Sequence, residues 1–301
     1  MSAPLVEVLM STHNGEKYVA QQVDSILRQS HRNLRLLVRD DGSTDGTLDQ
    51  LARIEDPRVL VRQGERLGLP QAFFQLLDES GDDADYWSLA DQDDVWLPDK
   101  VGRAVQMLAP YDGPAMCCTR VQVTDDNLRP LYRHELPQRG PSFANALVQN
   151  IALGCTTVIN RAARELLLHR WPDDCVMHDA WIYLVVAGTG TVVYDDEVQV
   201  LYRQHGGNTV GMGAGPAARL AGRVRRQMTA GGPGKHSRQD RELLRLHAHD
   251  LRPESLAQLK DLLVAQQALS RRVAYALAGP AHRQTRGSDV VLKALLVLGR
   301  V

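Results

Sequence analysis

The 301-residue sequence contains no run of about eighteen apolar residues, the length that a membrane-spanning helix requires. Its first residues, Met1 to Val8, lack both the basic and the apolar segment of a secretory signal peptide. These two absences predict a protein that stays in the cytoplasm. No internal repeat is evident.

Cysteine is scarce, and its spacing excludes two classes of protein. None of the four cysteines, Cys117, Cys118, Cys155 and Cys175, forms a Cys-x-x-Cys pair. The sequence therefore suggests neither a structural zinc site nor a disulfide framework, and we expect reduced, mostly buried thiols.

Acidic residues are concentrated where a predicted strand ends. Asp91, Asp93 and Asp94 directly follow the short apolar run 86–90. Because three carboxylates in four positions repel one another, solvent or a cation must offset them. Open α/β sheets bind ligands at the carboxyl ends of their strands. The cluster thus predicts a divalent metal with oxygen ligands and a phosphate-bearing substrate; the alternative is a solvated acidic loop.

The same arrangement occurs twice more along the chain. An apolar run ends in Asp40–Asp41 and leads through glycines to a helix that begins near Thr47. The first predicted strand, 5–10, ends in the polar segment 11–16 before an amphipathic helix over 18–29. Three successive β/α units therefore direct polar loops to one edge of the predicted sheet.

Five motifs in this order resemble those of family 2 nucleotide-sugar glycosyltransferases with the GT-A fold. They are Ser11–Asn14, Asp40–Gly46, Asp91–Asp94 followed by Trp96 and Lys100, His178–Asp179, and Tyr202–His205. The resemblance covers about the first 210 residues. The Asp-Gln-Asp-Asp-Val-Trp, His-Asp-Ala-Trp and Tyr-Arg-Gln-His segments are similar to those of bacterial rhamnosyltransferases of cell-surface polysaccharide assembly.

The fold class is expected to be α/β. Periodicity and the resemblance together predict a Rossmann-like, mainly parallel central sheet flanked by helices, and the resemblance alone implies an antiparallel portion near the acceptor side. Further helices are expected over 99–108, 143–149, 161–169, 180–187, 217–228, 239–249 and 255–278, and further strands over 115–123, 191–194 and 198–202.

Charge and glycine content predict two domains. Residues 215–301 hold 16 basic and 6 acidic residues, and the remainder holds 19 basic and 30 acidic ones. The join lies near the glycine-dense segment 206–216. We therefore expect a GT-A domain over 1–210 and, over 211–301, a glycine-rich loop followed by a basic helical region.

The resemblance implies a bound Mg²⁺ or Mn²⁺ that neutralises the leaving diphosphate. Asp93 is the expected metal ligand, and His205 resembles the histidine that completes the metal site. Asp91 would face the ribose hydroxyls or a metal-bound water, and Asp94 would either cap the following turn or form hydrogen bonds to groups that surround the metal ligands. The alternative for His205 is an ordinary surface or core histidine.

The resemblance also implies donor-binding groups, which are Ser11, Thr12, His13, Glu16, Asp40, Asp91, Gln92 and Arg203. Thr12 and His13 would contact a pyrimidine, and Asp40 would accept a hydrogen bond from its N3–H group. Arg203 offers bidentate donors to phosphate oxygens. Glu16 has the alternative role of a negative charge in the first turn of a helix, and Arg203 that of a surface residue.

On the acceptor side, the resemblance makes Asp179 the catalytic base, which removes the proton of the acceptor hydroxyl. Cys155, His178 and Trp181 are expected near the acceptor, where an indole stacks on sugar C–H faces. The alternatives are a structural acid at a helix start for Asp179 and a core tryptophan for Trp181.

These residues predict an inverting, metal-dependent glycosyltransferase that uses a nucleoside diphosphate sugar such as dTDP-rhamnose. The acceptor would be a hydroxyl of a glycan or a lipid-linked molecule in surface polysaccharide synthesis, with no nucleic-acid partner. The alternative is a non-catalytic protein that binds a nucleotide sugar or a polyanion. A nucleotidyltransferase would carry a glycine-rich basic loop after its first strand, which this chain lacks.

The basic C-terminal region ends in an apolar run, Val290–Leu298, which is too short to cross a bilayer but able to lie at its surface. It predicts peripheral contact with the inner face of the cytoplasmic membrane. The alternatives are packing of this run on the catalytic domain, and a homodimer contact.

Overall fold

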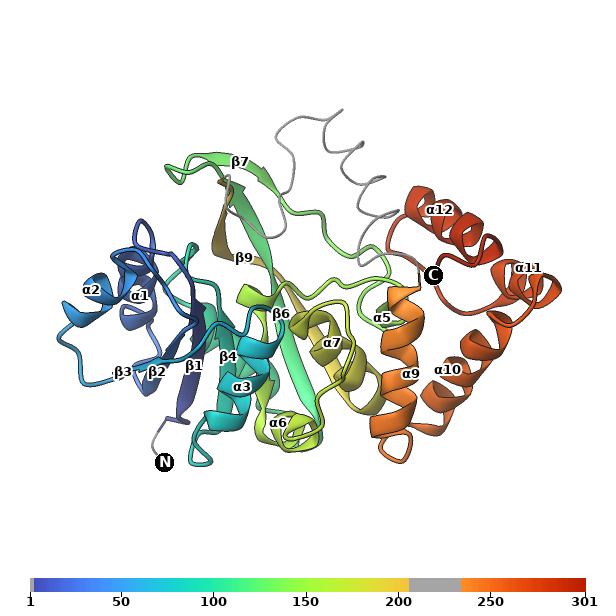
Figure 1. Cartoon of the computed structure of the whole chain (residues 1–301), viewed down its shortest axis with the longest axis horizontal. Coiled ribbons are helices and arrows are strands. Elements are labelled where there is room, and N and C mark those ends of the chain that lie inside the picture. The colour runs from blue at the N-terminus through green and yellow to red at the C-terminus, as the bar shows by residue number, and fades with distance from the viewer. Residues whose placement is uncertain (1–2, 206–233) are drawn as a thin grey trace. The chain divides into compact units, whose positions relative to one another are not determined.

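The computed structural model describes residues 3–205 and 234–301, which form two compact units (Figure 1). Among these residues, 3–136, 152–169 and 193–205 make up the first unit, and 137–151, 170–192 and 234–301 make up the second. Two internal segments therefore group with the C-terminal helices. The domain boundary expected near residue 210 and the helix expected over 217–228 lie outside the described residues.

The first unit is built around a mixed sheet. Its parallel part consists of neighbouring strands in the order β3, β2, β1 and β4, which are Val59–Gln63, Leu34–Asp40, Val6–Thr12 and Tyr86–Ala90. Antiparallel pairing then joins β4 to β8 and β8 to β6, and also β7 to β6 and β5 to β9. These strands are β5 Val95–Trp96, β6 Ala115–Thr124, β7 Pro130–Arg133, β8 Val158–Asn160 and β9 Thr191–Arg203.

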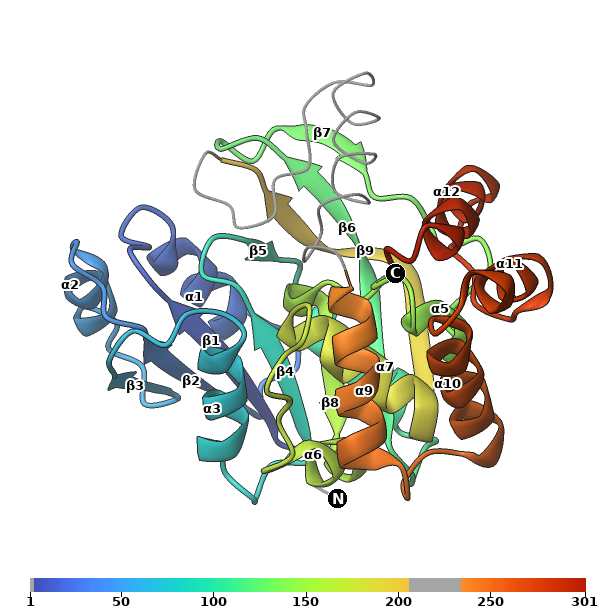
Figure 2. The same cartoon turned by 45° about the vertical axis from the view of Figure 1, so that its right-hand side comes forward.

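Helices cover the sheet because the apolar residues of β1, β2 and β4 are buried and need partners on both faces. Helix α3 packs against β1 and β2, as Figure 2 shows. The helices of this unit are α1 Val19–Leu27, α2 Thr47–Ala52, α3 Gln71–Glu79, α4 Lys100–Leu108 and α6 Arg161–Leu167. A short 3₁₀ helix, η1, spans Gly154–Thr156.

The second unit is helical. It contains α5 Phe143–Ala146, α7 His178–Thr189, α9 Lys235–His247, α10 Pro253–Ala265, α11 Leu269–Ala278 and α12 Arg286–Val297. Helix α7 is buried on all sides from His178 to Gly188, as expected for an apolar helix at the centre of a core. Figure 2 shows α9 and α10 beside α7. Within the described parts of the chain, no helix has the length and apolar character to cross a membrane.

The predicted α/β fold is confirmed, including its antiparallel portion. The helix expected over 255–278 is instead two helices, α10 and α11, and the strands expected over 191–194 and 198–202 are the single strand β9. Several elements were not predicted by range, namely β3, α3, β5, β7, η1, β8 and α12. Strands β3 and β7 are largely exposed at their side chains, so they lack the apolar alternation that marks a strand.

Candidate functional site

The polar loops after β1, β2 and β4 meet at one edge of the sheet, because these three strands are parallel neighbours. Thr12, the last residue of β1, pairs in register with Asp40, the last residue of β2. Strand β4 ends at Ala90, directly before the acidic loop 91–94. In the first unit, the polar loops therefore lie at one edge of the sheet, as predicted.

The loops after β1 and β2 are tied together by hydrogen bonds. Asn14, which adopts a left-handed backbone conformation (φ 49°), accepts a hydrogen bond from the Thr44 amide at 2.8 Å. The Gly15 amide donates to Thr47 Oγ1 at 2.7 Å, and the Gly46 amide donates to Glu16 Oε2 at 3.1 Å. Glu16 thus fixes the loop after β2, and its contact with a nucleotide stays a prediction.

Asp40 is held in one orientation by three donors. Its Oδ1 accepts from the Ser43 amide at 2.9 Å, and its Oδ2 accepts from the hydroxyls of Thr12 at 3.0 Å and Ser43 at 2.5 Å. The turn needs Gly42, whose φ of +76° disfavours other residues. The Thr12–Asp40 contact brings together two residues that were predicted to recognise the base.

Gln92 connects the loop after β4 to the loop after β1. Its Oε1 accepts from the His13 amide at 2.9 Å, and its Nε2 donates to the His13 carbonyl at 3.0 Å. A Cβ atom at Gly15 would lie 2.2 Å from Gln92 Oε1, so only glycine fits without displacing this bridge. Gln92 therefore positions His13, the first residue after β1, and Ser11 is the last but one residue of that strand.

Asp93 and His205 form the pair that best fits a metal. Asp93 Oδ2 lies 2.8 Å from His205 Nε2, and the two side chains are 14% and 16% exposed. In an octahedral site with ligands at about 2.1 Å, adjacent ligand atoms are about 3.0 Å apart. A carboxylate suits both Mn²⁺ and Mg²⁺, whereas an imidazole nitrogen is better accepted by Mn²⁺ than by the harder Mg²⁺. The residues present therefore fit the ion that the family resemblance implies.

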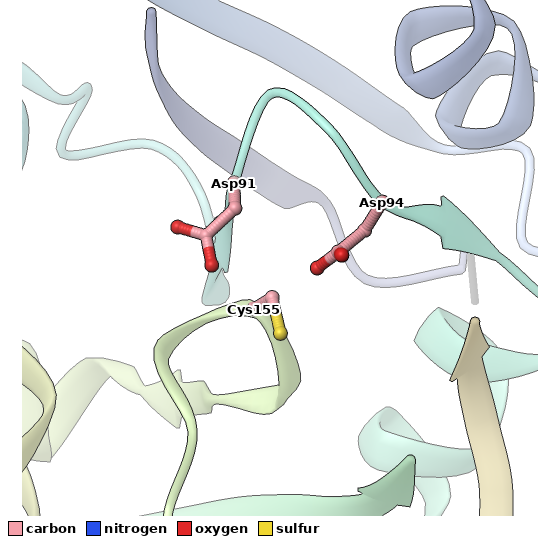
Figure 3. Close-up of side chains that lie close together, drawn as sticks. All are labelled: Asp91, Asp94 and Cys155. Carbon is pink, nitrogen blue, oxygen red and sulfur yellow. The ribbon is translucent and has the colours of Figure 1, made fainter. Parts of the chain in front are cut away.

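A second group of potential ligand atoms lies close by, on Asp91, Asp94 and Cys155 (Figure 3). Their ligand atoms are all within 4.8 Å of one another. Burial raises the pKa of the Cys155 thiol well above its usual range, which keeps the sulfur protonated and a poor ligand for a hard cation. Cys155 lies next to the loop 91–94 that carries these acids, as Figure 3 shows. Its expected place on the acceptor side stays a prediction.

Asp94 is fully buried, unlike Asp93. Burial, together with repulsion by Asp93 and Asp91, raises the pKa of the Asp94 carboxyl well above its usual range. Its Oδ1 accepts a hydrogen bond from the Arg203 amide at 3.0 Å. Asp94 therefore links the loop after β4 to the end of β9, rather than facing solvent as a metal ligand.

Arg203 is buried and donates to three protein groups. Its Nε bonds the Asp93 carbonyl at 2.8 Å, and its Nη1 and Nη2 bond the Asp126 carbonyl at 2.5 Å and Gln21 Oε1 at 2.7 Å. The guanidinium thus holds the backbone of Asp93 in place. A contact between Arg203 and a diphosphate stays a prediction.

Lys100 has a buried environment that the sequence did not reveal. Its side chain is buried, donates to Ser88 Oγ at 2.8 Å and lies 3.4 Å from the centre of the Trp96 ring. Burial lowers the pKa of Lys100 to about 7, against the opposing influence of Cys155, Cys117 and Asp94. The only sequence signal was its position four residues after Trp96, in the same motif.

The predicted acceptor-side residues His178, Asp179 and Trp181 lie in the first turn of α7, in the second unit. Burial lowers the pKa of His178 to about 3, so its imidazole is neutral. Asp179 Oδ1 accepts from the Ala180 amide at 2.7 Å, as an acid at a helix start does. Trp181 is fully buried and lies 5.8 Å, ring to ring, from His247, which agrees with the alternative of a core tryptophan.

Comparison with known proteins gives a consistent result. Residues 7–170 match the model of the family described as "Glycosyl transferase family 2". The dTDP-rhamnosyl transferase RfbG of Shigella flexneri is 27% identical over 217 residues, which cover 67% of this chain and 73% of that protein.

Two solved structures share the fold. Residues 1–349 of S. aureus TarS in complex with UDP-GlcNAc superpose with a TM-score of 0.58 at 14% identity, covering 98% of this chain and 90% of TarS 1–349. The mannosyltransferase PcManGT from Pyrobaculum calidifontis, in complex with GDP-Man and Mn²⁺, gives a TM-score of 0.53 at 18% identity, covering 99% and 88%. The family model spans more than half of the sequence, and the chain belongs to glycosyl transferase family 2.

Proposed function

We propose that this chain is an inverting, metal-dependent glycosyltransferase that moves a sugar from a nucleoside diphosphate to a hydroxyl of a glycan or a lipid-linked acceptor in surface polysaccharide synthesis. The observation that carries the proposal is the 2.8 Å pairing of Asp93 with His205 at the strand edge where the loops after β1 and β2 meet. The names of the relatives support the reaction class and the kind of product.

Asp93 and His205 would hold Mg²⁺ or Mn²⁺, which as a Lewis acid neutralises the charge of the leaving diphosphate. The structure of PcManGT with Mn²⁺ supports this choice of ion. Arg203 keeps the Asp93 backbone fixed, so the carboxylate does not need to reorganise when a donor binds.

The loops after β1 and β2 would bind the nucleoside. Thr12 and Asp40 are held together, and Gln92 fixes the His13 backbone, so these loops form a site that needs little ordering on binding. dTDP-rhamnose is the first donor to test, because the name of RfbG specifies a dTDP-rhamnosyl transferase. UDP-GlcNAc and GDP-mannose follow, because the two structural neighbours were solved with them.

A donor screen tests the proposal. Thermal unfolding is measured with each nucleoside diphosphate sugar, with and without Mn²⁺, because a ligand that binds only the folded protein raises the unfolding temperature. One donor should stabilise the chain more in the presence of Mn²⁺ than in its absence. Stabilisation that Mn²⁺ never changes would contradict the metal-dependent mechanism.

Asp179 is the proposed base for the acceptor hydroxyl. Asp179→Asn should keep donor affinity and reduce turnover by about 10²- to 10⁴-fold, because an amide cannot accept the proton. The Ala180 amide can still bond the side-chain oxygen of the introduced asparagine, so the helix start should survive. Near-normal transfer would exclude the role, and loss of soluble protein would favour a structural acid.

The proposed peripheral membrane contact rests on α11 and α12. Leu269, Val273 and Leu277 recur every four residues on α11 and are 58%, 38% and 79% exposed. Val290 and Leu298 are 68% and 64% exposed along α12 and just beyond its end. Residues 269–301 also expose Arg271, Arg286, Lys293 and Arg300 but no acid. Each basic residue near anionic lipid adds about 1 kcal/mol.

Because segments 137–151 and 170–192 group with the C-terminal helices, a point substitution tests this contact better than a truncation. Leu277→Glu should reduce co-sedimentation with anionic vesicles at low salt, whereas Gln138→Glu, which adds the same charge at another exposed position, should not. Equal absence of binding in all three proteins would leave α11 as a packing or homodimer surface.

A further inference from the structure

Tyr18, the residue directly before α1, lies against the proposed metal ligand. Its ring centre is 4.6 Å from that of His205, with an angle of 30° between the ring planes. The Arg203 guanidinium lies 4.8 Å from the centre of the same ring. Tyr18 therefore contacts both the residue that pairs with the Asp93 carboxylate and the residue that holds the Asp93 backbone.

The turn after β6 fixes this ring. The Tyr18 hydroxyl donates to one carboxylate oxygen of Asp126, and Lys17 Nζ forms an ion pair with the other oxygen. The Asp126 carbonyl accepts from Arg203 at 2.5 Å. Asp126 thus connects the start of α1, the β6–β7 turn and the end of β9.

We propose that Tyr18 is a positioning residue for the metal site, which restricts rotation of the His205 imidazole and keeps its Nε2 directed at Asp93. The inference rests on the proposed metal-dependent function. A tyrosine ring limits the number of orientations open to the imidazole before an ion arrives, so less order must be gained on binding. The hydroxyl contributes by anchoring the ring to Asp126.

The first test needs no metal. In the NMR spectrum of the metal-free protein, the His205 Cε1 proton is assigned by its absence from His205→Asn. A stacked ring at 4.6 Å should shift this resonance upfield. The shift should be lost in Tyr18→Leu and kept in Tyr18→Phe and in the control Tyr111→Leu, which alters an exposed tyrosine of the same unit. An unchanged resonance in Tyr18→Leu would overturn the inference.

The second test measures the Mn²⁺ concentration at which the effect of Mn²⁺ on the binding of UDP or dTDP is half of its maximum. Tyr18→Leu should raise it by about tenfold or more, as loss of a group that supports a metal ligand does, and Tyr18→Phe by less than about threefold. Unfolding of each metal-free variant is measured alongside, and Tyr111→Leu should leave the Mn²⁺ requirement unchanged.

The outcomes separate this inference from the function beneath it. In one outcome, nucleotide binding by Asp93→Asn no longer responds to Mn²⁺, but binding by Tyr18→Leu responds as in the unmodified protein. The positioning role is then wrong and the proposed metal site stands. If Asp93→Asn and the unmodified protein respond identically to Mn²⁺, both the metal site and the positioning role are overturned.

Discussion

Two acidic pairs lie at strand ends on either side of β1. Asp40 is the last residue of β2 and Asp41 follows it, whereas Asp93–Asp94 lie in the loop after β4. Protein donors surround the first pair. Asp41 accepts from the amides of Leu67 and Gly68 at 2.8 and 2.7 Å and forms a buried ion pair with Arg39. These contacts outweigh the effect of its burial and lower the pKa of the Asp41 carboxyl.

The second pair is treated differently. Burial and neighbouring charge raise the pKa of Asp94, and Asp93 points its carboxylate at a histidine rather than at an arginine. The contrast shows that the position of an acid at a strand end does not decide its role. An acid that protein donors neutralise supports the fold, whereas Asp93, which lies beside other acids, is the residue that we propose to bind a cation.

The largest effect that distinguishes the two pairs is expected for Asp93→Asn. Its turnover, with the donor that the screen identifies, should fall by about 10³-fold or more, because several kcal/mol of charge stabilisation depend on this ligand. Its thermal unfolding should change less than its turnover, since Asp93, unlike Asp94, is partly exposed. A variant with normal turnover would place Asp93 with the structural acids.

Asp41→Asn should show the reverse pattern. The substitution leaves Arg39 buried without its charged partner and weakens the acceptor for two amides, which should reduce the free energy of unfolding by about 3 kcal/mol. Urea titration measures this loss. The folded fraction should retain its Mn²⁺ dependence, and a variant as stable as the unmodified protein would remove Asp41 from the structural group.

The pH dependence of that loss gives a finer check. Because the pKa of Asp41 is lowered in the folded state from its ordinary 3.8, its contribution to stability is complete above that value and disappears as the pH falls through the folded pKa. The stability difference between the unmodified protein and Asp41→Asn should therefore be constant from about pH 7 to 5 and shrink below about pH 4. A difference that grows in acid would contradict the assignment.

The smallest effect is expected for Gly15→Ala. The added methyl group would displace Gln92 Oε1 from the His13 amide without removing any acid. Because the end of the Gln92 side chain can move, we expect only about threefold weaker binding of UDP or dTDP. Calorimetry measures this change, and unaltered affinity would show that the Gln92 bridge does not shape the nucleoside site.

Much of this arrangement was predictable from sequence. The apolar runs before Asp40 and Asp91 predicted parallel strands, and the parallel pairing placed both acids at one edge. The contacts of Tyr18 with Asp126, His205 and Arg203 were not predictable, because they join residues more than a hundred positions apart and leave no local pattern. Burial was equally invisible, so the sequence did not reveal that Asp94 and Trp181 are fully enclosed.

The proposed chemistry depends most on Asp93 binding the metal that the donor requires. The most direct measurement is calorimetry of UDP or dTDP binding, with and without Mn²⁺, to the unmodified protein, Asp93→Asn and the matched control Asp41→Asn. We predict that Mn²⁺ strengthens binding to the unmodified protein and to Asp41→Asn but not to Asp93→Asn. An equal effect of Mn²⁺ on all three proteins would contradict the claim.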